Sequence, residues 1–132
     1  MNSRKQKIIV VDDEISFLSI FSKALENAGF EVRGFSDPKE AIKQIPIERA
    51  DLILLDITMP EIDGFVVFEQ LKNYLGSKMP KTIFLTNLGE ADDQNSWVDD
   101  KFAKEAGALG HIRKTDDLEK IVARIKEVLS VS

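Results

Sequence analysis

Ile8-Ile9-Val10-Val11-Asp12-Asp13-Glu14 joins four consecutive apolar residues to three acids. A short apolar run without polar alternation is typical of a parallel strand that other elements cover on both faces. Residues 52–55 and 83–85 have the same pattern, and residues 31–35 and 110–112 are weaker strand candidates. The sequence therefore predicts five strands, three of them covered on both faces.

Helical spacing separates the predicted strands. Apolar residues recur every three or four positions, as on the buried face of a helix, in the segments 17–28, 38–45, 65–75, 102–106 and 118–129. Gly29, Gly76 and Gly107 follow three of these segments, where a left-handed C-terminal residue favours glycine. Asp116, with Glu119 three residues later, predicts a capping box at the start of the last helix.

The alternation of five strands with five helices predicts an α/β fold of the doubly wound type, a parallel sheet with helices on both faces. No linker, repeat or low-complexity block divides the chain, so we expect one domain over residues 1–132. In such sheets ligands bind at the carboxyl ends of the strands. A strand order of 2-1-3-4-5, one of the common orders of this fold, would place the first and third strands side by side.

Acidic residues stand at the two strand ends that this order makes neighbours. Asp12 and Asp13 follow the first strand, and Asp56 follows the third. Carboxylates a few ångströms apart repel one another, and a hard divalent cation with oxygen ligands is the usual compensation. We therefore expect a Mg²⁺ site here. The plainer alternative is a solvated loop or a helix cap, which is how most acids after a strand behave.

A hydroxyl and an ammonium stand at two further strand ends. Thr86 follows the fourth predicted strand, and Lys114 comes shortly after the fifth. A cation, an accessible carboxylate, a hydroxyl and an ammonium are the groups that move a phosphoryl group. We expect Asp56 to be the nucleophile, Lys114 to pair with a phosphate oxygen and Thr86 to donate its hydroxyl. A surface cation and a strand-end hydroxyl are the plainer alternatives.

The composition of the 132 residues narrows the class of protein. The chain has 18 Lys and Arg against 23 Asp and Glu, a net charge of −5, which argues against a nucleic-acid partner. It has no Cys, so disulfide frameworks and thiolate sites are excluded, and a reducing cytoplasm fits this composition. No apolar run approaches the roughly 18 residues that a membrane span needs. We expect a cytoplasmic protein with no membrane partner.

Four motifs together resemble the receiver domains of two-component response regulators. They are Val10-Val11-Asp12-Asp13-Glu14, Leu54-Leu55-Asp56-Ile57-Thr58-Met59-Pro60 with Asp63-Gly64 after it, Leu85-Thr86, and Gly107-Ala108 followed by Lys114. The resemblance covers nearly the whole chain and implies a flavodoxin-like (βα)5 fold with strand order 2-1-3-4-5. It implies a phosphorelay switch that accepts a phosphoryl group from a histidine kinase or phosphotransfer protein and changes its surface for a downstream protein partner.

The resemblance also implies the roles of individual residues. Asp56 would take the phosphoryl group. Asp13, Asp56 and the backbone carbonyl of Thr58 would bind Mg²⁺ directly, with Asp12 helping through water. Such a phosphoprotein catalyses only its own phosphorylation and dephosphorylation and is not otherwise an enzyme. The chain ends just after the last predicted helix, so we expect a stand-alone receiver over residues 1–132 with no output domain.

The sequence departs from the family pattern at several positions. Thr115 follows Lys114 where the family usually has Pro after a cis peptide bond, so either the fold holds a costly non-proline cis bond or the loop differs. Asn87 and Leu88 are bulkier than the residues usual after the fourth strand. His111 occupies the position of the rotating Tyr or Phe of the family, so we expect either a weaker switch there or simply a partly buried histidine.

The connection between Thr86 and Gly107 is longer than is common in the family and strongly acidic. It carries the residues Glu90, Asp92, Asp93, Trp97, Asp99 and Asp100. We expect either an acidic lid beside the site or, more plainly, a solvated loop that Trp97 staples to the core.

Two other functions compete with the phosphorelay switch. One is a Mg²⁺-dependent phosphatase that also forms an aspartyl phosphate. That class needs a second Asp two residues after its nucleophile, but Asp12 is followed at that distance by Glu14 and Asp56 by Thr58. The other is a docking module on a receiver fold that works without phosphorylation. The residues Asn87, His111 and Thr115, which depart from the family pattern, leave this alternative open.

Overall fold

The computed structural model describes residues 5–87 and 104–130. Its strands are β1 (Lys7–Val11), β2 (Glu31–Phe35), β3 (Leu52–Asp56), β4 (Lys81–Thr86) and β5 (Gly110–Arg113). Its helices are α1 (Ile15–Asn27), α2 (Pro38–Glu48), α3 (Gly64–Leu75), the 3-10 turn η1 (Gly76–Lys78) and α5 (Leu118–Ser130). The five predicted strands are all present, and each lies within two residues of its expected bounds.

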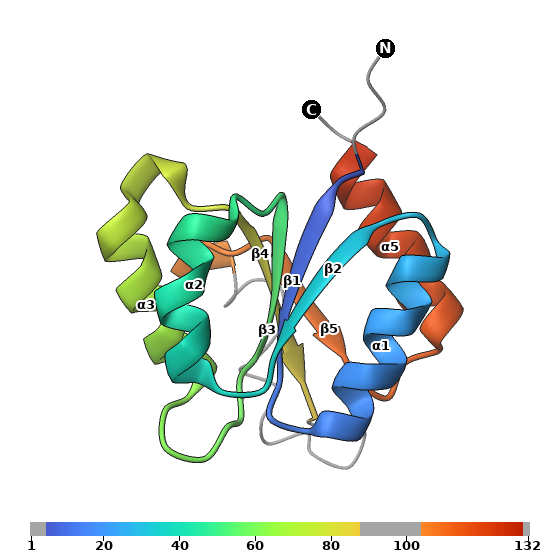
Figure 1. The fold of residues 1–132 in the computed structure, drawn as a ribbon, viewed down its shortest axis with the longest axis horizontal. Helices are drawn as coiled ribbons and strands as arrows, with labels where there is room; N and C mark the ends of the chain where they lie inside the picture. Colours follow the sequence, from blue (N-terminus) through green and yellow to red (C-terminus); the bar gives the residue numbers. More distant parts are fainter. Residues whose placement is uncertain (1–4, 88–103, 131–132) are drawn as a thin grey trace.

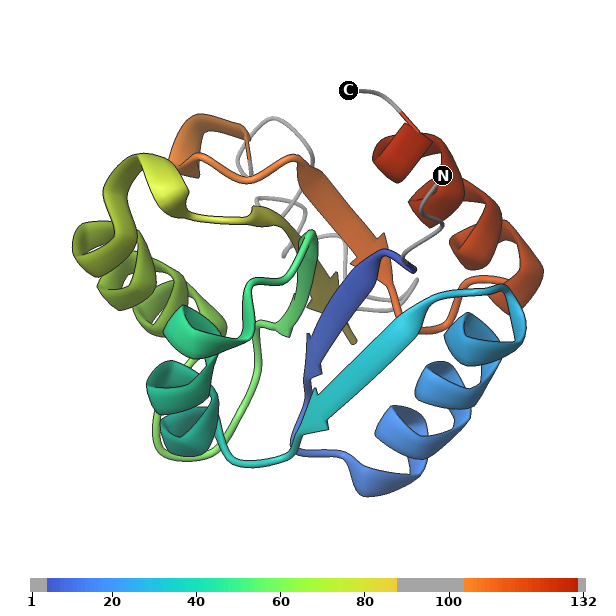
Figure 2. The same ribbon diagram turned by 45° about the horizontal axis from the view of Figure 1, so that its top comes forward.

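The five strands form one parallel sheet in the order β2-β1-β3-β4-β5. This order and the α/β class confirm the prediction. Helices α2 and α3 cover one face of the sheet, and α1 and α5 cover the other (Figure 1). Figure 2 shows the same layers from a second direction. The central strand β3 is buried along its whole length, as the uninterrupted apolar run predicts.

The sheet divides the hydrophobic core into two sets of side chains, because successive residues of a strand point to opposite faces. Ile53 and Leu55 pack with residues of α2 and α3, including Phe68. Leu54 packs with residues of α1 and α5, including Ile125. Both sets of side chains are buried next to the edge at which the strands end. The loops at that edge therefore begin from well-packed strands.

Helix α2 extends three residues past the predicted end at Ile45. Pro46 lies inside the helix, although proline removes a backbone donor there. The side chain of Glu48, only 10% exposed, pairs with both Lys7 and Arg33. These contacts to β1 and β2 hold the last turn of α2 in place, and the local sequence does not reveal them.

The N-cap of α5 lies one residue later than predicted. Asp117 Oδ1 accepts a hydrogen bond from the backbone N–H of Glu119 at 2.9 Å, and the Asp117 carbonyl accepts one from Ile121. The N–H of Asp116 instead donates to the carbonyl of Arg113. The expected cap at Asp116 was therefore wrong, because this residue belongs to the turn that follows β5.

The predicted helix over residues 102–106 lies partly outside the described residues. Residues 104–106 are helical, and Gly107 follows with a φ of +108°, as expected for the end of a helix. Leu88, Trp97 and the acidic residues of the long connection fall in the part of the chain that is not described, so the predicted lid stays a prediction.

Candidate functional site

Two acids meet where β1 and β3 end side by side. Asp12 directly follows β1 and Asp56 is the last residue of β3, and the two strands pair up to Val11 and Leu55. One carboxylate oxygen from each of Asp12, Asp13 and Asp56 lies within 4.8 Å of the other two. Asp12 and Asp56 are buried, at 0% and 1% exposure, while Asp13 faces partly outward. The structure thus brings together the three acids that the sequence selected.

Backbone N–H groups hold one oxygen of each buried acid. The N–H of Glu14 donates to Asp12 Oδ1 at 2.9 Å, and the N–H of Thr58 donates to Asp56 Oδ1 at 3.2 Å. The second oxygen of Asp56, Oδ2, is buried and has no hydrogen-bond partner among the described residues, whereas Asp12 Oδ2 lies 2.8 Å from the Lys114 ammonium. A buried carboxylate oxygen without a hydrogen-bond partner is costly, and a hard cation would satisfy Asp56 Oδ2. The cluster therefore fits Mg²⁺.

Gly64 allows the loop after β3 to fold closely over the site. The N–H of Gly64 donates to the carbonyl of Ile57 at 2.8 Å. A Cβ on Gly64 would lie 2.2 Å from the backbone oxygen of Asp56, which no real side chain tolerates. Asp63 caps α3 by accepting a hydrogen bond from the N–H of Val66. The Asp63-Gly64 pair therefore sets the path of the loop that carries Thr58.

Lys114 reaches the acids from the end of β5 and is nearly buried, with its side chain 3% exposed. Its Nζ lies 2.8 Å from Asp12 Oδ2, 2.7 Å from Glu14 Oε1 and 3.7 Å from Asp56 Oδ2. The Nζ also lies 4.7 Å from the centre of the Phe17 ring, a favourable position for a cation. Sequence reasoning assigned no role to Glu14 or Phe17, because only the fold brings α1 against the end of β5.

Thr86 and Thr58 lie at the same edge of the sheet. Thr86 ends β4, is 3% exposed, and its backbone carbonyl accepts a hydrogen bond from the N–H of Lys114 at 2.9 Å. Thr58 is exposed in the loop after β3. The structure therefore places all the residues selected from the sequence at the carboxyl edge of the sheet.

Burial dominates the electrostatics of Asp56. It raises the pKa of this carboxyl from 3.8 to about 7, and the charge of Asp12 acts in the same direction. Lys114 and the N–H of Thr58 lower the pKa but do not offset the rise. Burial alone would lower the pKa of Lys114, yet its contacts with the carboxylates outweigh burial and raise it. The site therefore holds excess negative charge that a cation would neutralise.

The residues that depart from the family pattern lie around this edge. The described residues include no cis peptide bond, so the loop at Thr115 differs from the family pattern. Asn87 is exposed just after β4, and His111 is partly buried in β5, as expected for a histidine on that strand. The carbonyl of His111 accepts a hydrogen bond from Arg124 Nη1 at 2.7 Å, which ties β5 to α5.

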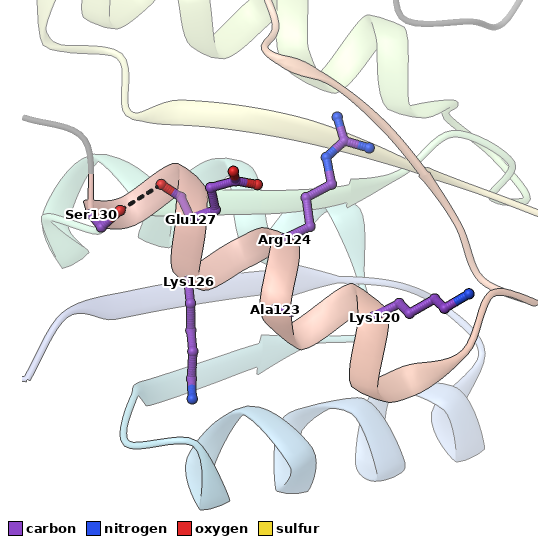
Figure 3. Close-up of a pocket in the computed structure, with 6 residues that line it drawn as sticks. All are labelled: Lys120, Ala123, Arg124, Lys126, Glu127 and Ser130. Carbon is purple, nitrogen blue, oxygen red and sulfur yellow. Dashed lines mark hydrogen bonds between the residues drawn. The ribbon is translucent and has the colours of Figure 1, made fainter.

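A shallow pocket on α5 lies away from the acids. Its lining residues are Lys120, Ala123, Arg124, Lys126, Glu127 and Ser130 (Figure 3). Arg124 and Glu127 point to one side of the helix and Lys126 to the other, and Ser130 Oγ donates to the Glu127 carbonyl. The pocket has mixed charge and no cluster of acids, so the chemistry of the site belongs to the strand ends.

A parallel sheet in this order, three clustered acids at its switch point and a lysine beside them define a doubly wound α/β domain with an acidic site at the strand ends. Residues 8–126 match the family model described as the response regulator receiver domain. The chain belongs to this family, whose members are the receiver domains of two-component systems. The resemblance inferred from the four motifs is therefore confirmed.

Curated relatives share about a third of their residues with this chain. The "Probable transcriptional regulator ycf27" of Cyanophora paradoxa is 35% identical over 129 residues, which is 98% of this chain and 50% of that protein. The "Alkaline phosphatase synthesis transcriptional regulatory protein PhoP" of Bacillus subtilis is 34% identical over 94% of this chain and 48% of its own length. The chain thus spans about half the length of the curated relatives it matches.

Solved structures of receiver domains have the same fold. A CheY-like receiver domain protein from Methanospirillum hungatei superposes with a TM-score of 0.80 at 28% identity, covering 96% of this chain and 95% of that one. The beryllofluoride-activated receiver domain of DrrB gives 0.76 at 27% identity, covering 96% of this chain and 99% of that one. In the described part of the chain, no helix is long and apolar enough to cross a membrane.

Proposed function

We propose that this chain is a signalling switch that accepts a phosphoryl group on Asp56 from a phosphohistidine of a histidine kinase or phosphotransfer protein. The observation that carries this proposal is the buried cluster of Asp12, Asp13 and Asp56 with the Lys114 ammonium beside it. The receiver family supports the same reading. The chain matches only about half of the length of the transcriptional relatives, so the proposal concerns this half alone.

Mg²⁺ would be held by the carboxylates of Asp13 and Asp56 and the Thr58 carbonyl, with Asp12 acting through water. When bound, the cation neutralises charge on the oxygens of the transferred group. Asp56 would attack from the end of β3, a strand whose residues are all buried. Its carboxylate oxygen forms a bond to phosphorus as the phosphorus–nitrogen bond of the donor breaks, and the freed imidazole keeps the electron pair of that bond.

Lys114 and Thr86 would respond to the new charge on Asp56. A phosphoryl dianion offers a charge-assisted hydrogen bond to the Lys114 ammonium and another to the Thr86 hydroxyl. Both residues sit on or beside the β4–β5 pair, since the N–H of Lys114 is bonded to the Thr86 carbonyl. A shift of either residue therefore moves the end of β5.

The surface that reports this shift would be β5 with α5. Arg124 joins the two through the His111 carbonyl, and the cationic Lys120 and Arg124 line the α5 pocket in Figure 3. We propose that a downstream protein docks on this face. The expectations of a cytoplasmic location, of a stand-alone domain and of no nucleic-acid partner stay predictions.

Incubation with acetyl phosphate and Mg²⁺, followed by intact mass spectrometry, tests the proposal. We expect a stable adduct of one phosphoryl group on the wild-type chain and none on Asp56→Asn. The matched control is Asp116→Asn, which changes an exposed carboxylate at the turn after β5 and should be labelled like the wild type. Labelling of Asp56→Asn would show that the nucleophile is another residue.

The same experiment separates the two competing functions. Continuous release of inorganic phosphate without an adduct would favour the Mg²⁺-dependent phosphatase. Absence of both adduct and release, also when a phosphorylated histidine kinase is supplied, would favour the docking module.

A further inference from the structure

Lys114 is pulled toward α1 rather than toward the proposed nucleophile. Its Nζ lies 2.7 Å from Glu14 Oε1 but 3.7 Å from Asp56 Oδ2. Among the described residues, the ammonium is therefore held by Glu14, outside the acid cluster, together with Asp12 Oδ2 at 2.8 Å. An oxygen at 3.7 Å is beyond hydrogen-bond range.

The backbone of Glu14 bonds Asp12 and α1, but among the described residues its side chain pairs with Lys114 alone. It is the N-cap residue of α1, yet its side chain makes no capping hydrogen bond, whereas N-cap side chains usually bond the first free N–H groups. Its carboxylate instead extends to Lys114. Phe17, one turn into α1, places its ring 4.7 Å from the same Nζ. The first turn of α1 thus provides two contacts to one cation.

We infer that Glu14 is a positioning residue that holds the Lys114 ammonium away from Asp56 until a phosphoryl group arrives. This inference rests on the proposed function, because it concerns the response of Lys114 to a phosphoryl group on Asp56. The ammonium leaves Glu14 when it moves to a phosphoryl oxygen, so the Glu14 contact opposes the phosphorylated state. Glu14 then sets how readily the site takes and keeps the phosphoryl group.

The Glu14–Lys114 contact opposes the phosphorylated state only modestly, because water can replace the lysine as a partner of Glu14. The side chain of Glu14 is 53% exposed, so its carboxylate is solvated once the ammonium leaves. Partly exposed ion pairs contribute little to stability. We therefore expect Glu14→Gln to tighten the binding of beryllofluoride, a phosphoryl analogue, by about two- to fivefold in the presence of Mg²⁺.

The control variant is Glu31→Gln. Glu31 also pairs with a lysine, Lys7, and its side chain is 58% exposed. It lies at the start of β2, at the end of the sheet opposite the acids. This change removes the same charge without touching Lys114, so we expect the affinity for beryllofluoride, followed by ¹⁹F NMR of the bound analogue, to stay at the wild-type value.

A double-mutant cycle separates positioning from simple charge repulsion. If Glu14 acts through Lys114, the gain from Glu14→Gln disappears in a Lys114→Gln background. The NMR signal of the Lys114 ammonium gives a second measurement: beryllofluoride should shift it in the wild type, and Glu14→Gln alone should shift it part of the way before the analogue is added.

The outcomes distinguish this inference from the proposed function. A wild-type chain that binds no beryllofluoride would contradict the proposed function itself. Wild-type binding that Glu14→Gln leaves unchanged or weakens would overturn the positioning role. A gain that persists in the Lys114→Gln background would overturn it as well, because repulsion between Glu14 and the analogue would then explain the effect.

Discussion

The buried Asp56 should make the metal-free protein less stable as the pH rises. Burial and Asp12 raise the pKa of the Asp56 carboxyl from 3.8 to about 7, so between these values the folded state binds a proton more tightly than the unfolded state. The free energy of unfolding therefore falls as the pH increases from about 4 to about 7 and then levels off. The ionised form at high pH is the destabilised one.

The size of this effect follows from the two pKa values. Each pKa unit corresponds to about 1.4 kcal/mol, so the fully ionised Asp56 costs about 4 kcal/mol relative to an unperturbed carboxyl. Asn at this position removes the titration and keeps an oxygen that can accept the hydrogen bond from the N–H of Thr58. We expect Asp56→Asn to be more stable than the wild type by about 2–4 kcal/mol at pH 8 and by less at pH 5.

Urea unfolding in EDTA, followed by circular dichroism at pH 5, 6, 7 and 8, measures the effect. The wild-type chain and the exposed-site control Asp116→Asn should lose stability over this range, and Asp56→Asn should lose much less. Equal pH profiles for the wild type and Asp56→Asn would show that folding does not raise the pKa of the Asp56 carboxyl. A wild-type chain that gains stability above pH 6 would refute the sign of the reasoning.

Three further predictions concern the same edge of the sheet. Mg²⁺ should stabilise the wild type, by about 1.4 kcal/mol at ten times its Kd, and stabilise Asp56→Asn less; equal melting temperatures with and without millimolar Mg²⁺ would contradict the acidic pocket. Gly64→Ala should destabilise the fold by about 2–3 kcal/mol in urea unfolding, because its Cβ meets the Asp56 oxygen; an unchanged midpoint would show that the loop relaxes freely. Asp63→Ala should cost about 1 kcal/mol through the lost cap of α3, whereas Asp63→Asn should retain most of the stability.

The architecture could be predicted from the sequence because it depends on local periodicity. The apolar run before Asp12 and the run that ends at Asp56 have no polar alternation, which suits strands covered on both faces. Once the strand order is given, the strand ends place the acids together. The sequence therefore predicted the strand ends at which the three acids and Lys114 stand, and the strand order common in this fold predicted that they meet.

Contacts between distant elements could not be predicted in this way. Glu14 looks like the third acid of a loop, and only the approach of α1 to the end of β5 shows that it meets Lys114. The extension of α2 through Pro46 depends on Glu48 and its partners on two strands. The predicted cap of α5 was one residue too early. Two aspartates stand in sequence here, and only the path of the chain after β5 shows that Asp116 belongs to the turn and Asp117 caps the helix.

The division of the core by the sheet has a consequence for how this domain can change over generations. Ile53 and Leu54 are joined by a peptide bond, yet they pack in separate sets of side chains. Substitutions at these two positions should therefore act nearly independently, because effects add when residues share no partners. Leu54 and Ile125, which are far apart along the chain but belong to one set, should instead constrain each other's size. In families with this fold, a strand residue should thus vary together with the residues that pack on the same face of the sheet, and not with its neighbour in the sequence.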